Sequence, residues 1–266
     1  MSPIKRSLAV VTGASTGIGL ELAKEFAKNG FDLVVIAENN EILAAAEQLR
    51  ELGANVRAIQ QDLATFEGVE NACSQIFEGG RPVDALALNA GVGAGGDFVR
   101  ETTLEKDLNV IDLNIRSTVH MAKRLLPDMV QRGSGRVLFT SSIAATMPGT
   151  LNSVYNGSKA FIQSFAQAIR RELEKTGVTV TALMPGPTET EFFRRADMED
   201  TRVGQSEKDD PAQVAHEGFE ALMAGKDHVV AGSFRNTVQA TMAHVLPDTL
   251  LADLHEKQGR RETPSH

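Results

Sequence analysis

Hydrophobic and polar positions show two patterns that alternate along the chain, one typical of buried strands and one typical of helices. Short apolar runs rich in β-branched residues recur between longer segments with helical spacing. The apolar runs predict seven strands, at Leu8 to Val11, Leu33 to Ile36, Val56 to Ile59, Ala85 to Leu88, Val137 to Thr140, Val178 to Met184 and, more weakly, Val229 to Ala231. Because strands that alternate with helices form parallel sheets covered on both faces, we expect an α/β fold with a doubly wound seven-stranded parallel sheet.

The segments between the strands predict crossover helices and one domain. Apolar residues recur at helical spacing in two early examples, namely Leu20, Ala23, Phe26 and Ala27, and then Leu43, Ala46, Leu49 and Leu52. No repeat, low-complexity block or linker interrupts the pattern, so residues 1–266 are expected to form a single domain, with a core of about residues 7–235 and a C-terminal extension at 236–266.

One segment, Glu189 to Asp210, is rich in charge and lacks sustained periodicity. A loop longer than about 12 to 15 residues is usually a functional lid or is disordered, and this one follows the carboxyl end of a strand. A solvated insertion is the alternative, and the pattern leaves both open.

Composition narrows the class of protein. The 266 residues include 27 Lys and Arg against 35 Asp and Glu, a net charge of -8, which argues against a general nucleic-acid binder. The single cysteine, Cys73, cannot form an internal disulfide and suits a reducing compartment, so a cytoplasmic location is expected. No run approaches the roughly 18 apolar residues of a membrane span, and the six histidines show no metal-binding spacing, so neither a membrane segment nor a metal site is predicted.

A glycine-rich turn follows the first predicted strand and opens the first helix. Gly13 can adopt a positive φ, Gly17 lets the backbone approach a diphosphate, and Gly19 lets helix and strand pack closely. The free N–H groups and the helix dipole at this point favour an anion. The spacing differs from the usual G-x-G-x-x-G, but strand, turn and helix together predict a dinucleotide site that also includes Ser15, Thr16 and Ile18.

An acidic residue, Glu38, ends the second predicted strand. A carboxylate there can accept hydrogen bonds from the adenosine ribose hydroxyls and repels the 2′-phosphate of NADP. Asn39 and Asn40 supply no positive charge that would attract this phosphate. The position therefore favours NAD, unless Glu38 is only a solvated loop charge.

The only tyrosine of the chain, Tyr155, is followed four residues later by Lys159. Asn156-Gly157 could mark a hairpin turn, but the apolar spacing of Val154, Phe161, Phe165, Ala168 and Ile169 favours a helix. On a helix the Lys159 ammonium neighbours the phenol and is expected to lower its pKa from about 10. Such a phenol can exchange a proton with a carbonyl or an alcohol.

These features resemble the short-chain dehydrogenase/reductase family over about residues 7 to 235. The resemblance implies a Rossmann-type fold and makes Tyr155 and Lys159 the catalytic pair. It places the catalytic serine thirteen residues before the tyrosine, at Ser142, and a helix-borne asparagine of the proton relay at Asn114. From residue type alone, Ser142 could instead cap a loop and Asn114 could simply interrupt a helix.

The resemblance also implies cofactor contacts, with Tyr155 and Lys159 among them. Beyond the glycine turn and Glu38, the matching positions are Asp62, Leu63, Asn89, Ala90, Gly91, Pro185, Gly186 and Thr188. One departure is Leu88, which stands where the family often has another asparagine.

The sequence therefore predicts an NAD(P)-dependent oxidoreductase, with NAD preferred. Hydride would move between nicotinamide C4 and a secondary alcohol or ketone carbon, with Tyr155 handling the proton and Ser142 the oxygen. The alternatives are an NADPH-dependent ketone or acyl-carrier reductase, and a non-catalytic dinucleotide-binding sensor or scaffold.

The expected partner is a moderately hydrophobic small-molecule substrate, with no nucleic acid and no membrane. Its pocket is expected to involve Met147, Pro148, Leu151, residues 92–98 and the Glu189 to Asp210 segment, with Phe192 and Phe193 as covers or as local core. The resemblance further implies a homodimer or homotetramer built on helices around Leu104 to Val130 and Ser153 to Lys175.

Overall fold

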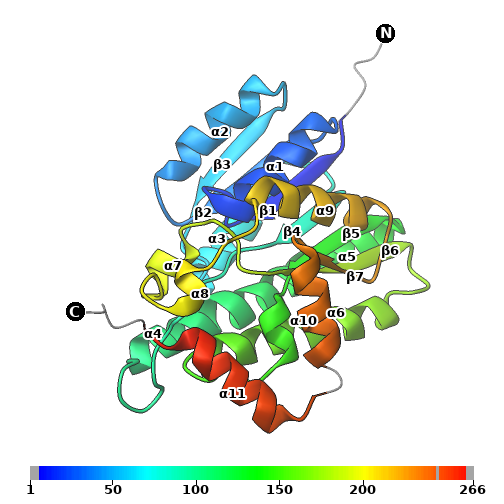
Figure 1. The fold of residues 1–266 in the computed structure, drawn as a ribbon. Helices are drawn as coiled ribbons and strands as arrows, with labels where there is room; N and C mark the ends of the chain where they lie inside the picture. Colours follow the sequence, from blue (N-terminus) through cyan, green and yellow to red (C-terminus); the bar gives the residue numbers. More distant parts are fainter. Residues whose placement is uncertain (1–5, 244–245, 262–266) are drawn as a thin grey trace.

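A seven-stranded sheet forms the centre of the molecule. The computed structural model describes residues 6–243 and 246–261. The strands are β1 (Leu8–Thr12), β2 (Asp32–Ala37), β3 (Val56–Gln60), β4 (Ala85–Leu88), β5 (Gly135–Thr140), β6 (Val178–Pro185) and β7 (His228–Ala231). All pairs are parallel, in the order β3-β2-β1-β4-β5-β6-β7 (Figure 1). The predicted fold and all seven predicted strands are confirmed.

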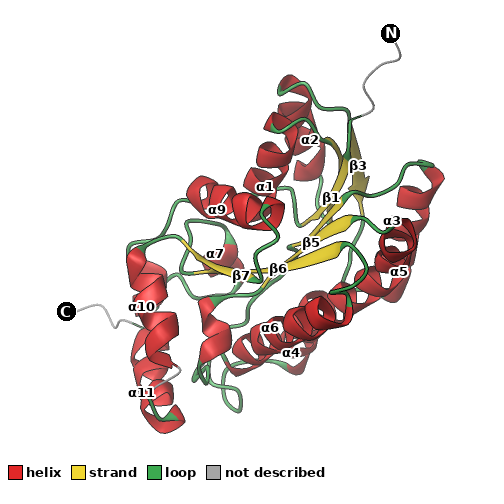
Figure 2. Cartoon of the chain, turned by 90° about the vertical axis from the view of Figure 1, so that its right-hand side faces the viewer, coloured by secondary structure: helices red, strands yellow, loops and turns green. Residues whose placement is uncertain are grey.

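Helices cover both faces of the sheet (Figure 2). One layer holds α1 (Gly17–Lys28), α2 (Glu41–Glu51) and α9 (Pro211–Met223). The other holds α3 (Phe66–Glu78), α4 (Leu104–Val110), α5 (Ser117–Arg132) and α6 (Ser153–Glu172). Because the strand order reverses between β1 and β4, a crevice opens outside the carboxyl ends of these strands, where α/β folds bind ligands.

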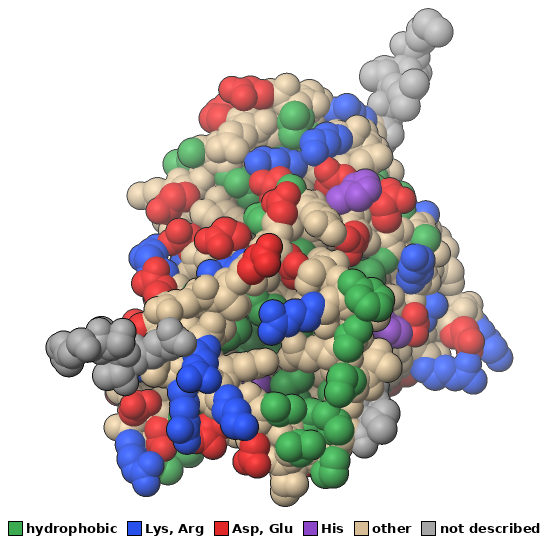
Figure 3. Space-filling model, in the orientation of Figure 1, with side chains coloured by type: hydrophobic (Ala, Val, Ile, Leu, Met, Phe, Trp, Pro, Cys, Tyr) green, Lys and Arg blue, Asp and Glu red, His purple; other side chains and the backbone are tan. Residues whose placement is uncertain are grey.

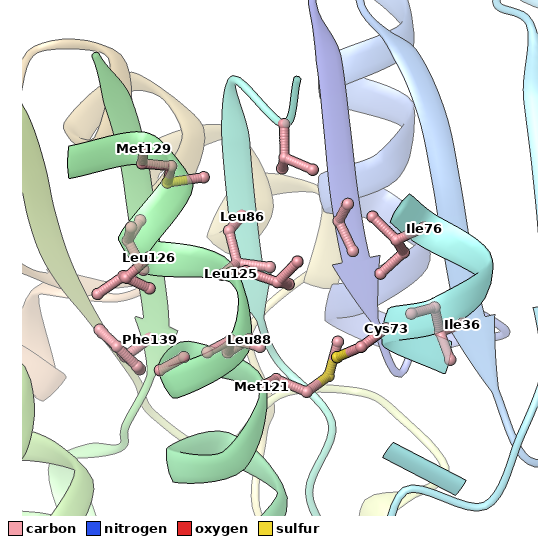
Figure 4. Close-up of a cluster of buried hydrophobic side chains, with 14 of the residues drawn as sticks. Ile36, Cys73, Ile76, Leu86, Leu88, Met121, Leu125, Leu126, Met129 and Phe139 are labelled. Atoms are coloured by element: carbon pink, nitrogen blue, oxygen red, sulfur yellow. The ribbon is translucent and has the colours of Figure 1, made fainter. Parts of the chain in front are cut away.

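Two apolar cores lie on opposite sides of the sheet. In β1, Val10 faces the core under α3, α5 and α6, whereas Ala9 and Val11 face the core under α1, α2 and α9. Figure 4 shows the first core, in which Cys73 of α3 and Met121 of α5 meet side chains of the strands. A strand buried on both faces has no polar side to alternate with, which explains the continuous apolar runs.

The helices form where predicted, but two buried faces differ from the expected ones. In α2 the buried residues are Ile42, Ala45, Ala46 and Leu49, whereas Leu43 is 57% exposed. In α6 the buried residues include Asn156, Ser158 and Lys159, while Phe161 is 39% exposed. Apolar spacing identified each helix, but the packing partner decided which stripe it buries.

The Glu189 to Asp210 segment is more ordered than predicted. It contains two short helices, α7 (Phe192–Arg195) and α8 (Arg202–Gln205), and a bridge between Thr188 and Asp209 that closes its base. The C-terminal extension forms α10 (Phe234–Ala243) and α11 (Asp248–Gly259), and α11 packs against α8. These elements gather around the carboxyl ends of the strands (Figure 1).

The described part of the chain offers neither a membrane span nor a metal cluster. Among residues 6–243 and 246–261, no helix combines the length and apolarity needed to cross a bilayer. In the same ranges no group of three or more His, Cys, Asp or Glu side chains could hold a metal ion.

Candidate active site

A cavity of about 470 Å³ occupies the crevice at the carboxyl ends of the strands. Its walls come from the glycine turn after β1, the ends of β2 to β6, the Glu189 to Asp210 segment, α10 and α11. The cavity collects all but one of the predicted site residues: Gly13, Ser15, Thr16, Gly17, Ile18, Gly19, Glu38, Asp62, Leu63, Asn89, Ala90, Gly91, Ser142, Tyr155, Lys159, Pro185, Gly186 and Thr188. The exception is Asn114, which is buried behind the wall.

The glycine turn has the geometry of an anion cradle. Gly13 and Gly17 adopt φ values of 66° and 57°, which L side chains rarely tolerate. A Cβ on Gly19 would lie 2.1 Å from the Gly13 carbonyl oxygen, so only glycine fits there. The N-cap residue Thr16 makes no side-chain cap to α1, which leaves first-turn N–H groups for a ligand. The turn therefore fits a dinucleotide diphosphate.

Hydrogen bonds among the strand ends hold the cavity floor together. Thr12 Oγ1 accepts bonds from the backbone N–H groups of Asn89 at 2.9 Å and Ala90 at 3.0 Å. The Asn89 amide donates to the Thr12 carbonyl, and Thr140 Oγ1 donates to Asn89 Oδ1 at 3.1 Å. Asn89 thus joins β1, β4 and β5 behind the cofactor region.

Tyr155 and Lys159 both face the cavity from the first two turns of α6. The Lys159 Nζ lies 5.7 Å from the centre of the Tyr155 ring and donates a 2.9 Å hydrogen bond to the Thr140 carbonyl. Burial raises the pKa of Tyr155 to about 12, although a hydrogen bond with Ser142 partly opposes this. Burial also lowers the pKa of Lys159 to about 8.

The expectation that Lys159 lowers the pKa of Tyr155 is wrong for this state of the protein. Desolvation is the largest cause of both shifts, and it disfavours the charged form of each group. The phenol is therefore held protonated at neutral pH.

Ser142 serves both as a cap and as a cavity residue. It is the N-cap of a 3₁₀ helix, Ile143–Thr146, and its Oγ accepts a bond from the Ala144 N–H at 3.1 Å. The same hydroxyl donates to the Pro185 carbonyl at 3.4 Å. Ser142 can therefore be both a cap and a catalytic serine, because the cap holds its hydroxyl on the cavity wall beside Tyr155.

Asn114 lies in a π-helical segment, Ile111–Arg116, between α4 and α5. Its side-chain Oδ1 accepts a bond from the Val92 N–H at 2.9 Å, and its Nδ2 donates to the Val92 carbonyl and to Ser158 Oγ. A Cβ on Gly91 would lie 3.1 Å from Asn114 Oδ1 and 3.3 Å from Lys159 Nζ. The side chain is thus occupied in fixing the wall next to Lys159, and π-helical turns often mark functional sites.

Glu38 lines the cavity directly after β2 and lies close to a positively charged side chain. Its carboxylate lies 3.9 Å from the Arg195 guanidinium, which comes from α7 on the opposite lip. The residues that neighbour Glu38 along the chain, Asn39 and Asn40, give no sign of this cation. Sequence pattern could not predict this ion pair, because 157 positions separate Glu38 from Arg195.

Of the residues predicted for the substrate pocket, Val92, Met147 and part of the Glu189 to Asp210 segment line the cavity, whereas Pro148 and Leu151 do not. Both Phe192 and Phe193 reach the cavity, and the Phe192 ring centre lies 5.0 Å from that of Tyr155. Residues 93–98 do not line the cavity, but Gly93 and Gly95 pack against the Glu189 to Asp210 segment. A Cβ on Gly93 would lie 2.6 Å from the Phe192 ring.

Several cavity residues had no recognisable sequence signal. The C-terminal extension contributes Asn236, Gln239, His255, Lys257 and Gln258. Asn152 also lines the cavity, but an asparagine before a helix looks like an ordinary cap.

Comparisons with known proteins agree with this geometry. A model described as short chain dehydrogenase matches residues 7–200. Oxidoreductase UcpA of Salmonella typhimurium is 32% identical over 225 residues, which cover 84% of this chain and 82% of that protein.

Two solved structures share the fold. A short-chain dehydrogenase from Sphingobium yanoikuyae, in complex with NADPH, is 29% identical with a TM-score of 0.79, covering 84% of this chain and 87% of that one. A short chain dehydrogenase/reductase from Burkholderia phymatum, in complex with NAD, is 23% identical with a TM-score of 0.80 and covers 100% of both chains. The chain therefore shares the fold of these two short-chain dehydrogenases.

Proposed function

Since this chain belongs to the short-chain dehydrogenase family and is an NAD(P)-dependent oxidoreductase acting on CH–OH groups, we propose that Tyr155 is its acid–base residue and that Ser142 binds the reacting oxygen. The observation that carries the proposal is the meeting of Tyr155, Ser142 and Lys159 on one cavity wall. A protein that only bound the dinucleotide would need no phenol beside Ser142 and Lys159. This argues against the non-catalytic alternative.

The cavity residues fit a nicotinamide dinucleotide. The glycine turn would hold the diphosphate, Asp62 and Leu63 the adenine, and Pro185, Gly186 and Thr188 the nicotinamide. Lys159, whose ammonium has three donors, would hold the nicotinamide ribose. When bound, the nicotinamide donates or accepts the hydride.

The chain itself moves the proton. In the reductive direction the Tyr155 phenol gives its proton to the substrate oxygen as negative charge develops there, and Ser142 Oγ donates a hydrogen bond to the same oxygen. In the oxidative direction the Tyr155 phenolate removes the alcohol proton. Phe192 lies over the Tyr155 ring and excludes water from this exchange.

Substituting Tyr155→Phe tests the proposal. The variant keeps the ring and its contact with Phe192 but has no proton to exchange, so kcat with a panel of alcohols and ketones should fall by a factor of about 10² to 10⁴. Steady-state kinetics with NADH and NADPH measure this loss.

Cofactor binding provides the control for that variant. NADH fluorescence titration should give a dissociation constant within about threefold of the wild type, because the glycine turn between β1 and α1 and the Lys159 ammonium remain in place and only one hydroxyl is lost. Turnover retained by Tyr155→Phe would refute the assignment.

We propose further that the enzyme prefers NAD. The Glu38 carboxylate can bond both hydroxyls of the adenosine ribose, and repels a 2′-phosphate at the same place. Arg195 reduces this repulsion, since it lies 3.9 Å from Glu38, so the preference should be moderate. A strong preference for NADPH would favour a ketone or acyl-carrier reductase instead.

Substituting Glu38→Ser should raise kcat/KM with NADPH by at least about tenfold and lower it with NADH, because Arg195 then faces the phosphate unopposed. Glu41→Ser is the matched control, since Glu41 is an exposed acid in the first turn of α2 and does not line the cavity. A wild-type enzyme that already favours NADPH tenfold would contradict the role given to Glu38.

Two features of the partners complete the proposal. The apolar wall of Phe192, Met147 and Val92 favours a small-molecule substrate with a hydrophobic body. Exposed apolar residues on α4 and α6 favour assembly into a homodimer or homotetramer.

A further inference from the structure

Asn152 is a buried amide that the protein itself leaves partly unpaired. It is the N-cap residue of α6 and is only 5% exposed, yet its side chain makes no capping hydrogen bond. Its Oδ1 has no hydrogen-bond partner among the described residues. Its Nδ2 has the Met198 sulfur at 3.7 Å, which is a weak acceptor.

This arrangement breaks two general rules at once. Asparagine is favoured at the N-cap because its oxygen can accept a bond from the first turn, and Asn152 forgoes that bond. Buried polar atoms are nearly always hydrogen-bonded, since leaving one unmatched is costly. Because Asn152 is one of the residues that line the cavity, a bound ligand can supply the missing partner.

The position of Asn152 relates it to the reacting carbon. Asn152 comes three residues before Tyr155, and side chains with that spacing are neighbours on one helix face. Tyr155 and Ser142 already provide for the reacting oxygen. Met147, Phe192 and Met198 give the same cavity apolar surface, and Met198 reaches the Asn152 amide. Asn152 therefore adds an unpaired polar group next to apolar cavity residues, which suits a second polar group of the substrate.

The chemistry of the amide selects this group. The unpaired Oδ1 needs a donor, which a ketone, an ether or a carboxylate lacks. An ammonium donates but cannot accept from Nδ2, whereas a hydroxyl can both donate and accept, and suits the amide whichever way it is turned.

We propose that Asn152 recognises a second hydroxyl close to the reacting carbon, so that the substrates are hydroxy ketones and the corresponding diols with an otherwise apolar body. This inference rests on the proposed oxidoreductase function and names its substrate class. Asn152 determines specificity and takes no part in the proton transfer.

Matched pairs of ketones test the inference. The pairs are acetophenone with α-hydroxyacetophenone, and hexyl methyl ketone with its α-hydroxy derivative. The wild type should reduce the hydroxy member with at least about tenfold higher kcat/KM, because a site built to bond a hydroxyl discriminates against the analogue without it. Asn152→Leu, of similar shape, should lose at least about tenfold on the hydroxy member and change the plain ketone by less than about threefold, chiefly through KM.

Asn156→Ala is the matched control. Asn156 also carries a buried, unpartnered Oδ1, but it does not line the cavity, and its Nδ2 bonds the Met147 carbonyl at 3.3 Å and approaches His255 Nε2 at 3.2 Å. Loss of this amide should change both members of a pair by the same factor and leave their ratio intact.

The inference fails if the wild type shows no preference within the pairs, or if Asn152→Leu lowers both members equally, as a purely structural role would. It also fails if the wild type reduces other carbonyl compounds but none of these four. These outcomes leave the proposed function standing, whereas a protein that binds NADH and reduces no carbonyl compound at all would defeat the proposed function itself.

Discussion

At the scale of single residues, burial decides the chemistry of the site. Tyr155 and Lys159 have the spacing that would let an ammonium stabilise a phenolate, yet desolvation shifts the pKa of each group towards its neutral form. Sequence spacing predicted that these two side chains are neighbours, and in the structure the Lys159 Nζ lies 5.7 Å from the centre of the Tyr155 ring. The spacing could not predict the sign of the pKa shift of Tyr155, because that sign depends on how much water the walls exclude.

The raised pKa of Tyr155 predicts different pH profiles for the two directions of the reaction. Reduction needs the protonated phenol, which is present at every pH below the raised pKa of about 12. Oxidation needs the phenolate, whose fraction grows about tenfold per pH unit below that pKa. Initial rates at low substrate should therefore give a kcat/KM for oxidation that rises from about pH 6 to pH 10, and a kcat/KM for reduction without this rise.

Rates of cofactor binding at each pH serve as the control for these profiles. An oxidation profile that is flat over the same range would mean that the phenol does not limit proton transfer.

At the scale of elements, the two faces of α6 have different tasks. Tyr155 and Lys159 of α6 line the cavity, whereas Ile162 and Ala166 pack on the core. Its outer face keeps Phe161 39% exposed, beside α4, where Leu104 is 71% and Leu108 is 46% exposed. A second apolar surface lies over α10 and α11 (Figure 3), where Phe234 is 81% exposed. Such surfaces are typical of interfaces between subunits.

The exposed apolar residues of α4 and α6 predict self-association. Light scattering at micromolar concentration should give a dimer or tetramer for the wild type, and Leu108→Glu should shift the mass towards the monomer, because a charge would be buried in the interface. Leu43→Glu on α2 is the matched control, since Leu43 is 57% exposed in the other helical layer. A wild type that is monomeric at this concentration would contradict the prediction.

At the scale of the whole molecule, the cavity is closed by segments far apart in the sequence. Met198 of the Glu189 to Asp210 segment reaches Asn152 at the start of α6. His255 of α11 bonds the Thr150 carbonyl and approaches Asn156, so the C-terminal extension holds the loop that precedes Tyr155. Burial lowers the pKa of His255, which keeps this contact neutral at physiological pH. The extension, for which the sequence suggested no role, thus becomes part of the cavity wall.

Local pattern alone specified the strands, their parallel arrangement, the glycine cradle and the pairing of Tyr155 with Lys159. Each of these depends on residues within a few positions of one another, or on the rule that parallel strands bring their carboxyl ends to one edge. Asn152, Arg195 and His255 became visible as site residues only in the folded chain. Their surroundings come from segments tens to hundreds of positions away, and burial, charge pairing and an unmet hydrogen bond exist only once those segments have packed together.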